Sequence, residues 1–324
     1  MKRLAACGVA VVALLALCVL SLCVGNEWIG PGAVYRALTD FGGSDVDRVV
    51  RYLRLPRTVA GLVVGAALGL AGGLMQGVTR NPLADPGILG VTAGAAAAVV
   101  GAIGLLGVHS LTGYVWFAMG GALVTTVVVY LIGGAAPVRL ALTGAAISAM
   151  LGSLTSAVTL LDLSTLNEYR FWVVGSLSLA TGPIVAQALP FVAVGTILAL
   201  VLGQSLNQLA LGDELAQSLG TRMILVRVLA GAAVVVLAGT ATAIAGPIGF
   251  VGLAVPHVAR RIVGPDYRRL LPWSMVVAPM VLLLADVLGR IAVRPAELQV
   301  GIVTALIGAP VFIALVRRQR VAEL

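Results

Sequence analysis

Few residues of this 324-residue chain have the types and spacing that catalysis requires. Cys7, Cys18 and Cys23 all lie in the first apolar run, where they predict small apolar side chains of a helix and neither a disulfide framework nor a metal cluster. The sequence has no HExxH, CxxC or GxSxG motif. Lys2 is the only lysine, so the chain lacks the lysine that a P-loop places against nucleotide phosphates. We therefore expect no catalytic site, no metal site and no cofactor in this chain.

One acid–base pair stands inside the apolar runs. Asp286 and Arg290 are four residues apart, which places them on one face of a helix, where an ion pair would lower the cost of insertion into a membrane. Proton- and sodium-coupled carriers line a relay with carboxylates, histidines or lysines, and the apolar runs contain no such series. An ion-coupled secondary transporter therefore stays only as the alternative class. If the chain moves a solute uphill, the energy comes from another chain.

The composition is that of a membrane protein. Hydrophobic residues make up 60% of the chain, charged residues 10%, and the mean hydropathy is +1.08. A soluble domain averages about 45–50% apolar and about 25% charged residues. Apolar runs of about 20 residues, long enough to cross a bilayer core, recur along the chain. We therefore expect an all-α polytopic membrane protein in which residues 1–324 form a single transmembrane domain. The ten expected spans lie near residues 4–24, 58–78, 87–107, 114–133, 138–161, 188–206, 227–246, 248–258, 272–291 and 299–316.

The distribution of basic residues predicts the orientation. With the N-terminus inside, 13 of the 21 lysines and arginines fall on the cytoplasmic side, as the positive-inside rule requires. Ten spans then put both termini in the cytoplasm. This topology and anionic lipid headgroups account for the net charge of +8, so we expect a multi-pass protein of the cytoplasmic membrane without a nucleic-acid partner. Five of the eight outside arginines lie in loop 25–57, an excess that needs its own explanation.

Two features are typical of transporters built from inverted repeats. The eighth run, 248–258, is too short to cross a membrane and predicts a half-helix packed inside the protein. The second and seventh spans begin with the similar sequences Arg57-Thr-Val-Ala-Gly and Arg227-Val-Leu-Ala-Gly, and they run in opposite directions in the predicted topology. This similarity is consistent with an inverted five-plus-five pseudo-repeat.

The second span carries glycine at every fourth position. Such a stripe occupies one helix face and lets another helix backbone approach closely. The same smooth face could also line a translocation path, and the two interpretations are compatible. The five residues are Gly61, Gly65, Gly69, Gly73 and Gly77.

The segment 207–226 is the longest inside loop and predicts a short amphipathic helix. Two acidic residues suit its positive N-terminal end, and a glycine suits its C-terminal stop. The alternatives are a helix that receives force from a partner protein and one that only lies on the membrane surface. The residues that would contact such a partner are Asp213, Glu214, Leu215, Ala216, Ser218, Leu219 and Gly220.

Four stretches carry the pattern of a known family. The first is the motif Glu214-Leu-Ala216-x-x-x-Gly220, similar to the E-A-A-x-x-x-G motif of ABC importer permeases, where a short helix docks on the ATPase. The other three resemble the FecCD family of permeases for ferric siderophores, haem and cobalamin, which includes the BtuC-like permeases. They are Arg54-Leu-Pro-Arg57 with the later Arg80-Asn-Pro-Leu-Ala-Asp-Pro-Gly87, Gly246-Pro-Ile-Gly-Phe-Val-Gly-Leu253 with Pro256-His257, and Gly308-Ala-Pro-Val-Phe312.

The resemblance implies a fold, partners and a cargo. It implies a BtuC-like (type II importer) fold of ten helices, a second permease subunit of the same or a related sequence, two cytoplasmic ATPases that bind ATP and Mg²⁺, and an extracytoplasmic binding protein. It further implies that Arg54, Arg57 and Arg290 dock with acidic residues of the binding protein, although headgroup anchoring is the alternative for the first two. The cargo implied first is a ferric siderophore, with haem or cobalamin as alternatives.

Overall fold

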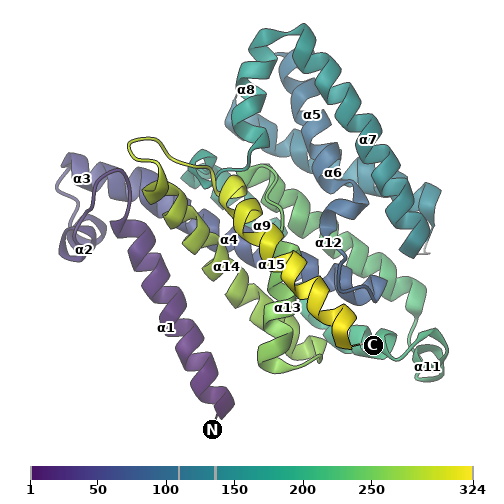
Figure 1. Ribbon diagram of the computed structural model, residues 1–324. Helices are drawn as coiled ribbons and strands as arrows, with labels where there is room; N and C mark the ends of the chain where they lie inside the picture. Colours follow the sequence, from purple (N-terminus) through teal and green to yellow (C-terminus); the bar gives the residue numbers. More distant parts are fainter. Residues whose placement is uncertain (1, 109, 135–136, 323–324) are drawn as a thin grey trace.

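The computed structural model describes residues 2–108, 110–134 and 137–322, and all regular secondary structure in these residues is helical (Figure 1). The first half of the chain forms α1 (Lys2–Cys23), α2 (Pro31–Thr39), α3 (Asp45–Arg48), the π-helical η1 (Val49–Arg54), α4 (Leu55–Thr79), the 3-10 helix η2 (Pro86–Leu89), α5 (Val91–Leu106), α6 (Leu111–Gly133) and α7 (Pro137–Leu161). The second half forms α8 (Leu163–Val173), the 3-10 helix η3 (Leu177–Leu179), α9 (Gly182–Val201), α10 (Gly203–Ala210), α11 (Asp213–Ser218), α12 (Met223–Ala245), α13 (Val251–Val263), α14 (Tyr267–Ala292) and α15 (Val300–Ala322).

The ten expected spans correspond to ten helices of the described chain. Seven are long and apolar enough to cross a membrane, namely α1, the continuous run that ends with α4, α6, α7, α9, α12 and α14. The helices α5, α13 and α15 have shorter apolar segments. The helices α9 and α14 begin six and five residues before the apolar runs, at Gly182 and Tyr267, because their first turns include polar and proline residues. The predicted all-α polytopic architecture is confirmed.

Helix α4 is the centre of the bundle and packs against α9, α12, α13 and α14 (Figure 1). Helix α14 runs antiparallel to it, because Tyr267 at the start of α14 lies beside Gly77, whereas Asp286 near its end bonds to Arg57. We call the end of the bundle at Arg57 outer and the end at Gly77 inner, after the orientation that the arginines predict.

The glycine stripe of α4 faces α14. A Cβ atom on Gly65 would lie 2.6 Å from the Cα of Pro279, and one on Gly69 would lie 2.5 Å from the carbonyl oxygen of Ser274. Both neighbours are backbone atoms, which cannot turn aside as a flexible side chain can. The stripe is therefore the surface on which two helix backbones approach each other, as the packing interpretation requires.

Helix α13 is the predicted half-helix and begins in the middle of the bundle. Its first turn lies against Gly72 of α4, where a Cβ atom would be only 1.8 Å from the carbonyl oxygen of Gly252. Gln76 of α4 donates a hydrogen bond to the carbonyl of Leu253 at 3.1 Å. A helix of 13 residues spans about 20 Å, which is too short for a bilayer core. Contacts with α4 therefore cover the first turn of α13, as expected for a helix that begins inside the protein.

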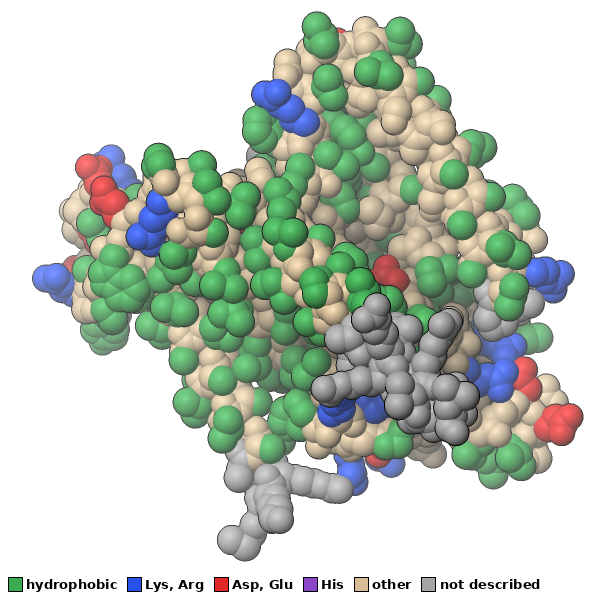
Figure 2. All heavy atoms as spheres, viewed as in Figure 1, with side chains coloured by type: hydrophobic (Ala, Val, Ile, Leu, Met, Phe, Trp, Pro, Cys, Tyr) green, Lys and Arg blue, Asp and Glu red, His purple; other side chains and the backbone are tan. Residues whose placement is uncertain are grey.

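Two helices lie at the edges of the molecule. Only 17% of the apolar stretch of α1, and 17% of that of α7, is buried inside the chain, compared with 78% for the run that ends with α4. Hydrophobic side chains cover the sides of the molecule, and charged ones gather chiefly over α2 and α3 at one end and near α11 at the other (Figure 2). The free faces of α1 and α7 are therefore open to lipid or to another membrane protein.

Candidate functional site

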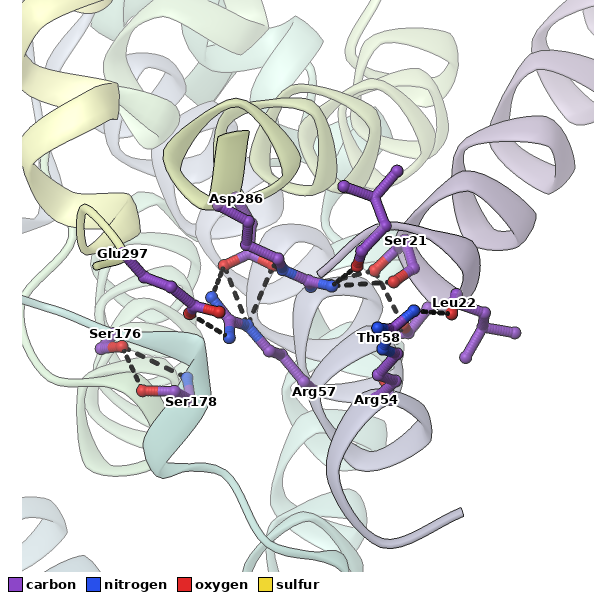
Figure 3. Close-up of polar contacts among 11 residues, drawn as sticks. Ser21, Leu22, Arg54, Arg57, Thr58, Ser176, Ser178, Asp286 and Glu297 are labelled. Atoms are coloured by element: carbon purple, nitrogen blue, oxygen red, sulfur yellow. Dashed lines mark hydrogen bonds and ion pairs between the residues drawn. The ribbon is translucent and has the colours of Figure 1, made fainter. Parts of the chain in front are cut away.

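A polar cluster occupies the outer end of the bundle, and its centre is the carboxylate of Asp286 (Figure 3). Arg57 donates hydrogen bonds to this carboxylate at 2.9–3.2 Å and one to Glu297 at 2.7 Å. Arg290 donates its Nε to Asp286 at 3.0 Å, and its Nη2 forms an ion pair with the same oxygen. The expected ion pair of Asp286 and Arg290 is present. Arg57 is a third member of the cluster, whereas sequence analysis had assigned it only to docking. We call Arg54, Arg57, Asp286, Arg290 and Glu297 the outer cluster.

Two arginines of the outer cluster close the C-terminal end of α1. Arg54 donates to the carbonyls of Leu22 at 2.8 Å and Cys23 at 2.6 Å. Arg290 donates to the carbonyls of Ser21 at 2.8 Å and Val24 at 2.9 Å. The last carbonyls of a helix have no partner within the helix, and they carry its negative partial charge. These guanidinium groups therefore donate hydrogen bonds to the unpaired carbonyls and place positive charge beside the negative end of the helix. They also attach α1 to α4 and α14.

The burial of the arginines separates the three residues that the resemblance assigned to docking. Arg54 is 7% exposed and Arg290 is 1% exposed. Their donors bond to carbonyls and carboxylates of this chain, so the geometry gives both an internal role, while docking by them stays an untested prediction. Arg57 is the most exposed of the three, with a side chain that is 12% exposed. All three arginines line an outer cavity of about 370 Å³ together with Glu297.

The segment expected to meet an ATPase lies at the inner end and has the predicted local structure. Helix α11 carries Asp213 and Glu214 in its first turn. Gly220 follows the helix with φ +80°, a left-handed conformation that glycine adopts without strain. Leu215 and Leu219 are each 57% exposed, and they are four residues apart, so they lie on one helix face. An exposed pair of leucines on a water-facing helix is typical of a contact surface for a partner.

Asp213 joins α11 to the two helices at the heart of the bundle. Its carboxylate pairs with Arg80, directly after α4, at 3.0 Å and with Arg227 of α12 at 3.0 Å. Arg80 adopts φ 51°, a left-handed conformation that few residues other than glycine adopt. Because Arg80 follows the end of α4 and Arg227 stands near the start of α12, the two helices are antiparallel. A displacement of α11 would therefore act on both at once.

Sequence analysis missed Arg80 and Arg227, although one signal for Arg227 was available. Arg57 and Arg227 occupy equivalent positions in the similar sequences that begin α4 and α12. Each pairs with carboxylates at its own end of the bundle, Arg57 with Asp286 and Glu297, and Arg227 with Asp213. The predicted inverted repeat therefore places one anchoring arginine at each end.

The described residues contain no group of three or more His, Cys, Asp or Glu side chains that could hold a metal ion. The two ends of the bundle carry ion pairs and exposed apolar side chains, and such features suit docking.

The FecCD transport family matches residues 13–318. This chain belongs to the FecCD transport family. The match includes both the outer cluster and α11. Among curated relatives, the chain is 44% identical over 305 residues to the ferric enterobactin transport system permease protein FepD of Escherichia coli (strain K12), covering 93% of this chain and 91% of the relative.

Other members of the FecCD family extend the comparison. The chain is 39% identical over 305 residues to the cobalamin import system permease protein BtuC of Halobacterium salinarum, covering 93% of this chain and 82% of that relative. A solved structure, described as an inward-facing conformation of a metal-chelate type ABC transporter, superposes with a TM-score of 0.85 at 32% identity. It covers 95% of this chain and 97% of the other, so the expected BtuC-like fold is confirmed.

Proposed function

We propose that this chain is the transmembrane permease subunit of an ATP-binding-cassette importer that takes up a ferric siderophore. The observation that carries the proposal is the 44% identity to a ferric enterobactin permease over nearly the whole chain. The composition is consistent with it, because a multi-pass helical protein without a P-loop lysine cannot hydrolyse ATP at a P-loop of its own, so ATP-driven uptake requires a separate ATPase. ATP and Mg²⁺ belong to that ATPase, and this chain performs no covalent chemistry.

Uptake of radiolabelled cargo tests this function. A strain that lacks the gene is offered ferric enterobactin, haem and cobalamin in parallel, with and without a plasmid copy of the gene. Loss and rescue of ferric siderophore uptake alone supports the proposal, whereas loss and rescue of cobalamin uptake alone identifies the second candidate, favoured by the 39% identity to a cobalamin permease. Loss and rescue of haem uptake alone would identify the third cargo. Uptake that resists vanadate and stops with a protonophore would identify an ion-coupled carrier instead.

We also propose that α11 is the contact with the ATPase. Leu215 and Leu219 provide an apolar surface that the chain itself leaves open, whereas the neighbouring Ala216 is buried and anchors the helix. The ion pairs of Asp213 with Arg80 and Arg227 then pass the motion to α4 and α12. Closure of two ATPases on ATP would in this way switch the path between two permease subunits from one side to the other.

Exchange of Leu215 and Leu219 for aspartate is expected to abolish co-purification of the ATPase. Both side chains are more than half exposed, so the free energy of unfolding is expected to change by less than about 0.5 kcal/mol. Asp213→Asn is expected to retain the ATPase and to lower uptake at least fivefold, because docking stays while the connection to α4 and α12 is lost. The control is Leu163→Asp, an exposed leucine at the outer end. Normal ATPase binding by the double leucine variant would contradict the assignment of α11.

We propose that the binding protein docks at the outer cavity beside Arg57. Glu297 is 35% exposed and forms an ion pair with Nη1 of Arg57. An acidic side chain of the binding protein would therefore compete with Glu297 for this guanidinium group. Arg57→Gln is expected to weaken docking at least tenfold. Glu297→Gln is expected to strengthen docking by up to about fivefold, the equivalent of a surface ion pair of about 1 kcal/mol. Surface plasmon resonance with the immobilised transporter measures both, and a fall in affinity for Glu297→Gln would contradict the competition.

The second permease subunit is proposed to cover the open face of α7. This helix has an apolar stretch only 17% buried, with Leu142, Met150 and Leu154 each more than half exposed. A pair of permeases would enclose a path between them that one chain alone does not. The predicted orientation, with both termini in the cytoplasm, follows from the same proposal, since it places α11 on the side where ATP is available.

A further inference from the structure

A groove lies between α1 and α14 at the inner end of the bundle. Its volume is about 310 Å³. Its walls are apolar, with Ala6 from α1, Ile262 from α13, and Pro272 and Trp273 from α14. Arg268 and Arg269, in the first turn of α14, also line it and lie at the inner, water-facing end of that helix.

Helix α1 does not close this groove. None of residues 6–20 is buried, and the first buried residue after them is Ser21, near the outer end of the helix. There the contacts of Arg54 and Arg290 hold α1, so it is attached at one end and lies along the edge of the bundle (Figure 1). An apolar groove at membrane depth does not hold water, because apolar walls offer it no hydrogen-bond partners. Lipid chains are the molecules available to fill it.

The charge beside the groove is positive and only partly balanced. Arg268 is exposed and forms an ion pair with no carboxylate of the described residues. Arg269 pairs with Asp266 at 3.6 Å, while its side chain stays 50% exposed. A hydrogen bond from Asn207 at 2.6 Å, with a second from the backbone NH of Arg268, lowers the pKa of Asp266, so this carboxylate stays ionised at neutral pH and holds only one of the two arginines.

The order of these groups along the membrane normal matches one kind of molecule. Two arginines stand at the inner end, and the indole of Trp273 follows one turn further along α14, as suits the membrane interface. The apolar side chains of Ala6 and Pro272 lie beside the indole. Basic pockets between membrane helices on the cytoplasmic side suit anionic headgroups, at about 1 kcal/mol for each basic residue near the surface. A zwitterionic headgroup gains little from the arginines, and a free anion gains nothing from the apolar walls.

We propose that this groove binds one anionic phospholipid, with its phosphate headgroup on Arg268 and Arg269 and an acyl chain along Trp273 and Ala6. The lipid would complete the packing of α1, which its own side chains leave open. None of the residues that line the groove belongs to α7 or α11. The lipid site is tested without transport, so its failure would leave the proposed function unaffected.

Native mass spectrometry of the purified full chain tests the proposal. The chain is titrated with phosphatidylglycerol and with phosphatidylcholine of the same acyl chains, and phosphatidylglycerol is expected to bind at least fivefold more tightly. The double substitution Arg268→Gln with Arg269→Gln is expected to weaken phosphatidylglycerol binding about tenfold and to leave phosphatidylcholine unchanged. Ala6→Phe, which fills the apolar part, is expected to weaken both lipids.

A matched control removes the same charge elsewhere. Arg139 and Arg222 are also exposed and lie toward the inner end, but neither lines the groove. The variant with glutamine at both positions is expected to bind phosphatidylglycerol with the same affinity as the parent protein. Equal affinity of the parent for the two lipids, or unchanged binding by the Arg268 and Arg269 variant, would overturn the proposal. Inorganic phosphate that displaces phosphatidylglycerol at millimolar concentration would show a site for a free anion, and would overturn it as well.

Discussion

Replacing Asp286 with alanine is expected to lower the free energy of unfolding by about 3–5 kcal/mol, because the change leaves buried positive charge without its counter-charge. Asp286 is fully buried, and Arg290 is 1% exposed. Arg57 would keep its ion pair with Glu297, whereas Arg290 would keep only hydrogen bonds to Ser21 and Val24. Equilibrium unfolding in mixed micelles, followed by circular dichroism, measures the difference.

Two further variants separate charge from shape at this position. Asp286→Asn keeps the volume and one acceptor oxygen, so we expect about half of the loss that alanine causes. Asp40→Asn removes an exposed carboxylate from the same end of the molecule and is expected to change stability by less than about 0.5 kcal/mol. If Asp286→Ala were no more destabilising than Asp40→Asn, the outer cluster would not be the structural centre described here.

Replacing Gly72 with alanine is expected to destabilise the protein by about 3 kcal/mol, which is the upper part of the range for overpacking a core. The added Cβ atom would lie 1.8 Å from the carbonyl oxygen of Gly252 and 2.5 Å from its carbonyl carbon. Both atoms belong to the first turn of α13, so relief requires the half-helix to move away from α4. The midpoint temperature of unfolding and the rate of iron uptake are both expected to fall, because the half-helix would be displaced.

Gly101 provides the matched control for this substitution. It also lies inside a helix, α5, but a Cβ atom there would meet nothing within 4 Å. Gly101→Ala is therefore expected to stabilise the protein by about 0.5–1 kcal/mol, since alanine loses less backbone entropy in a helix than glycine. Equal effects of the two substitutions would mean that the crossing of α4 and α13 is looser than the backbone distances indicate.

The helices were predictable because their signals are local. An apolar run of bilayer length and a run too short for a bilayer can each be counted along the sequence, and these counts predicted α12 as a span and α13 as a half-helix. The start of α11 at Asp213 and its end before Gly220 followed in the same way from charge and glycine positions. The boundaries of α9 and α14 were less accurate because hydrophobicity does not mark a first turn that contains proline or lies in water.

The candidate sites were only half predictable. The pairing of Asp286 with Arg290 follows from a spacing of four residues, and the structure contains it. The bond of Arg57 to Asp286 joins residues 229 positions apart, and no pattern in one sequence encodes it. The role of α11 in contacting an ATPase stays a prediction, since it depends on a chain that the sequence does not include.

The sequence by itself determined the class of the protein, its ten helices, the half-helix, and which face of α4 carries the stripe that includes Gly65. All of these depend on composition or on spacings of a few residues, which backbone geometry translates directly into structure. Only the tertiary structure decided that Arg54 and Arg290 cap α1, and that Gly72, outside the stripe, lies closer to a neighbouring backbone than any glycine of the stripe does. The physical reason is that these contacts are set by how rigid helices pack, and packing joins residues that lie far apart along the chain.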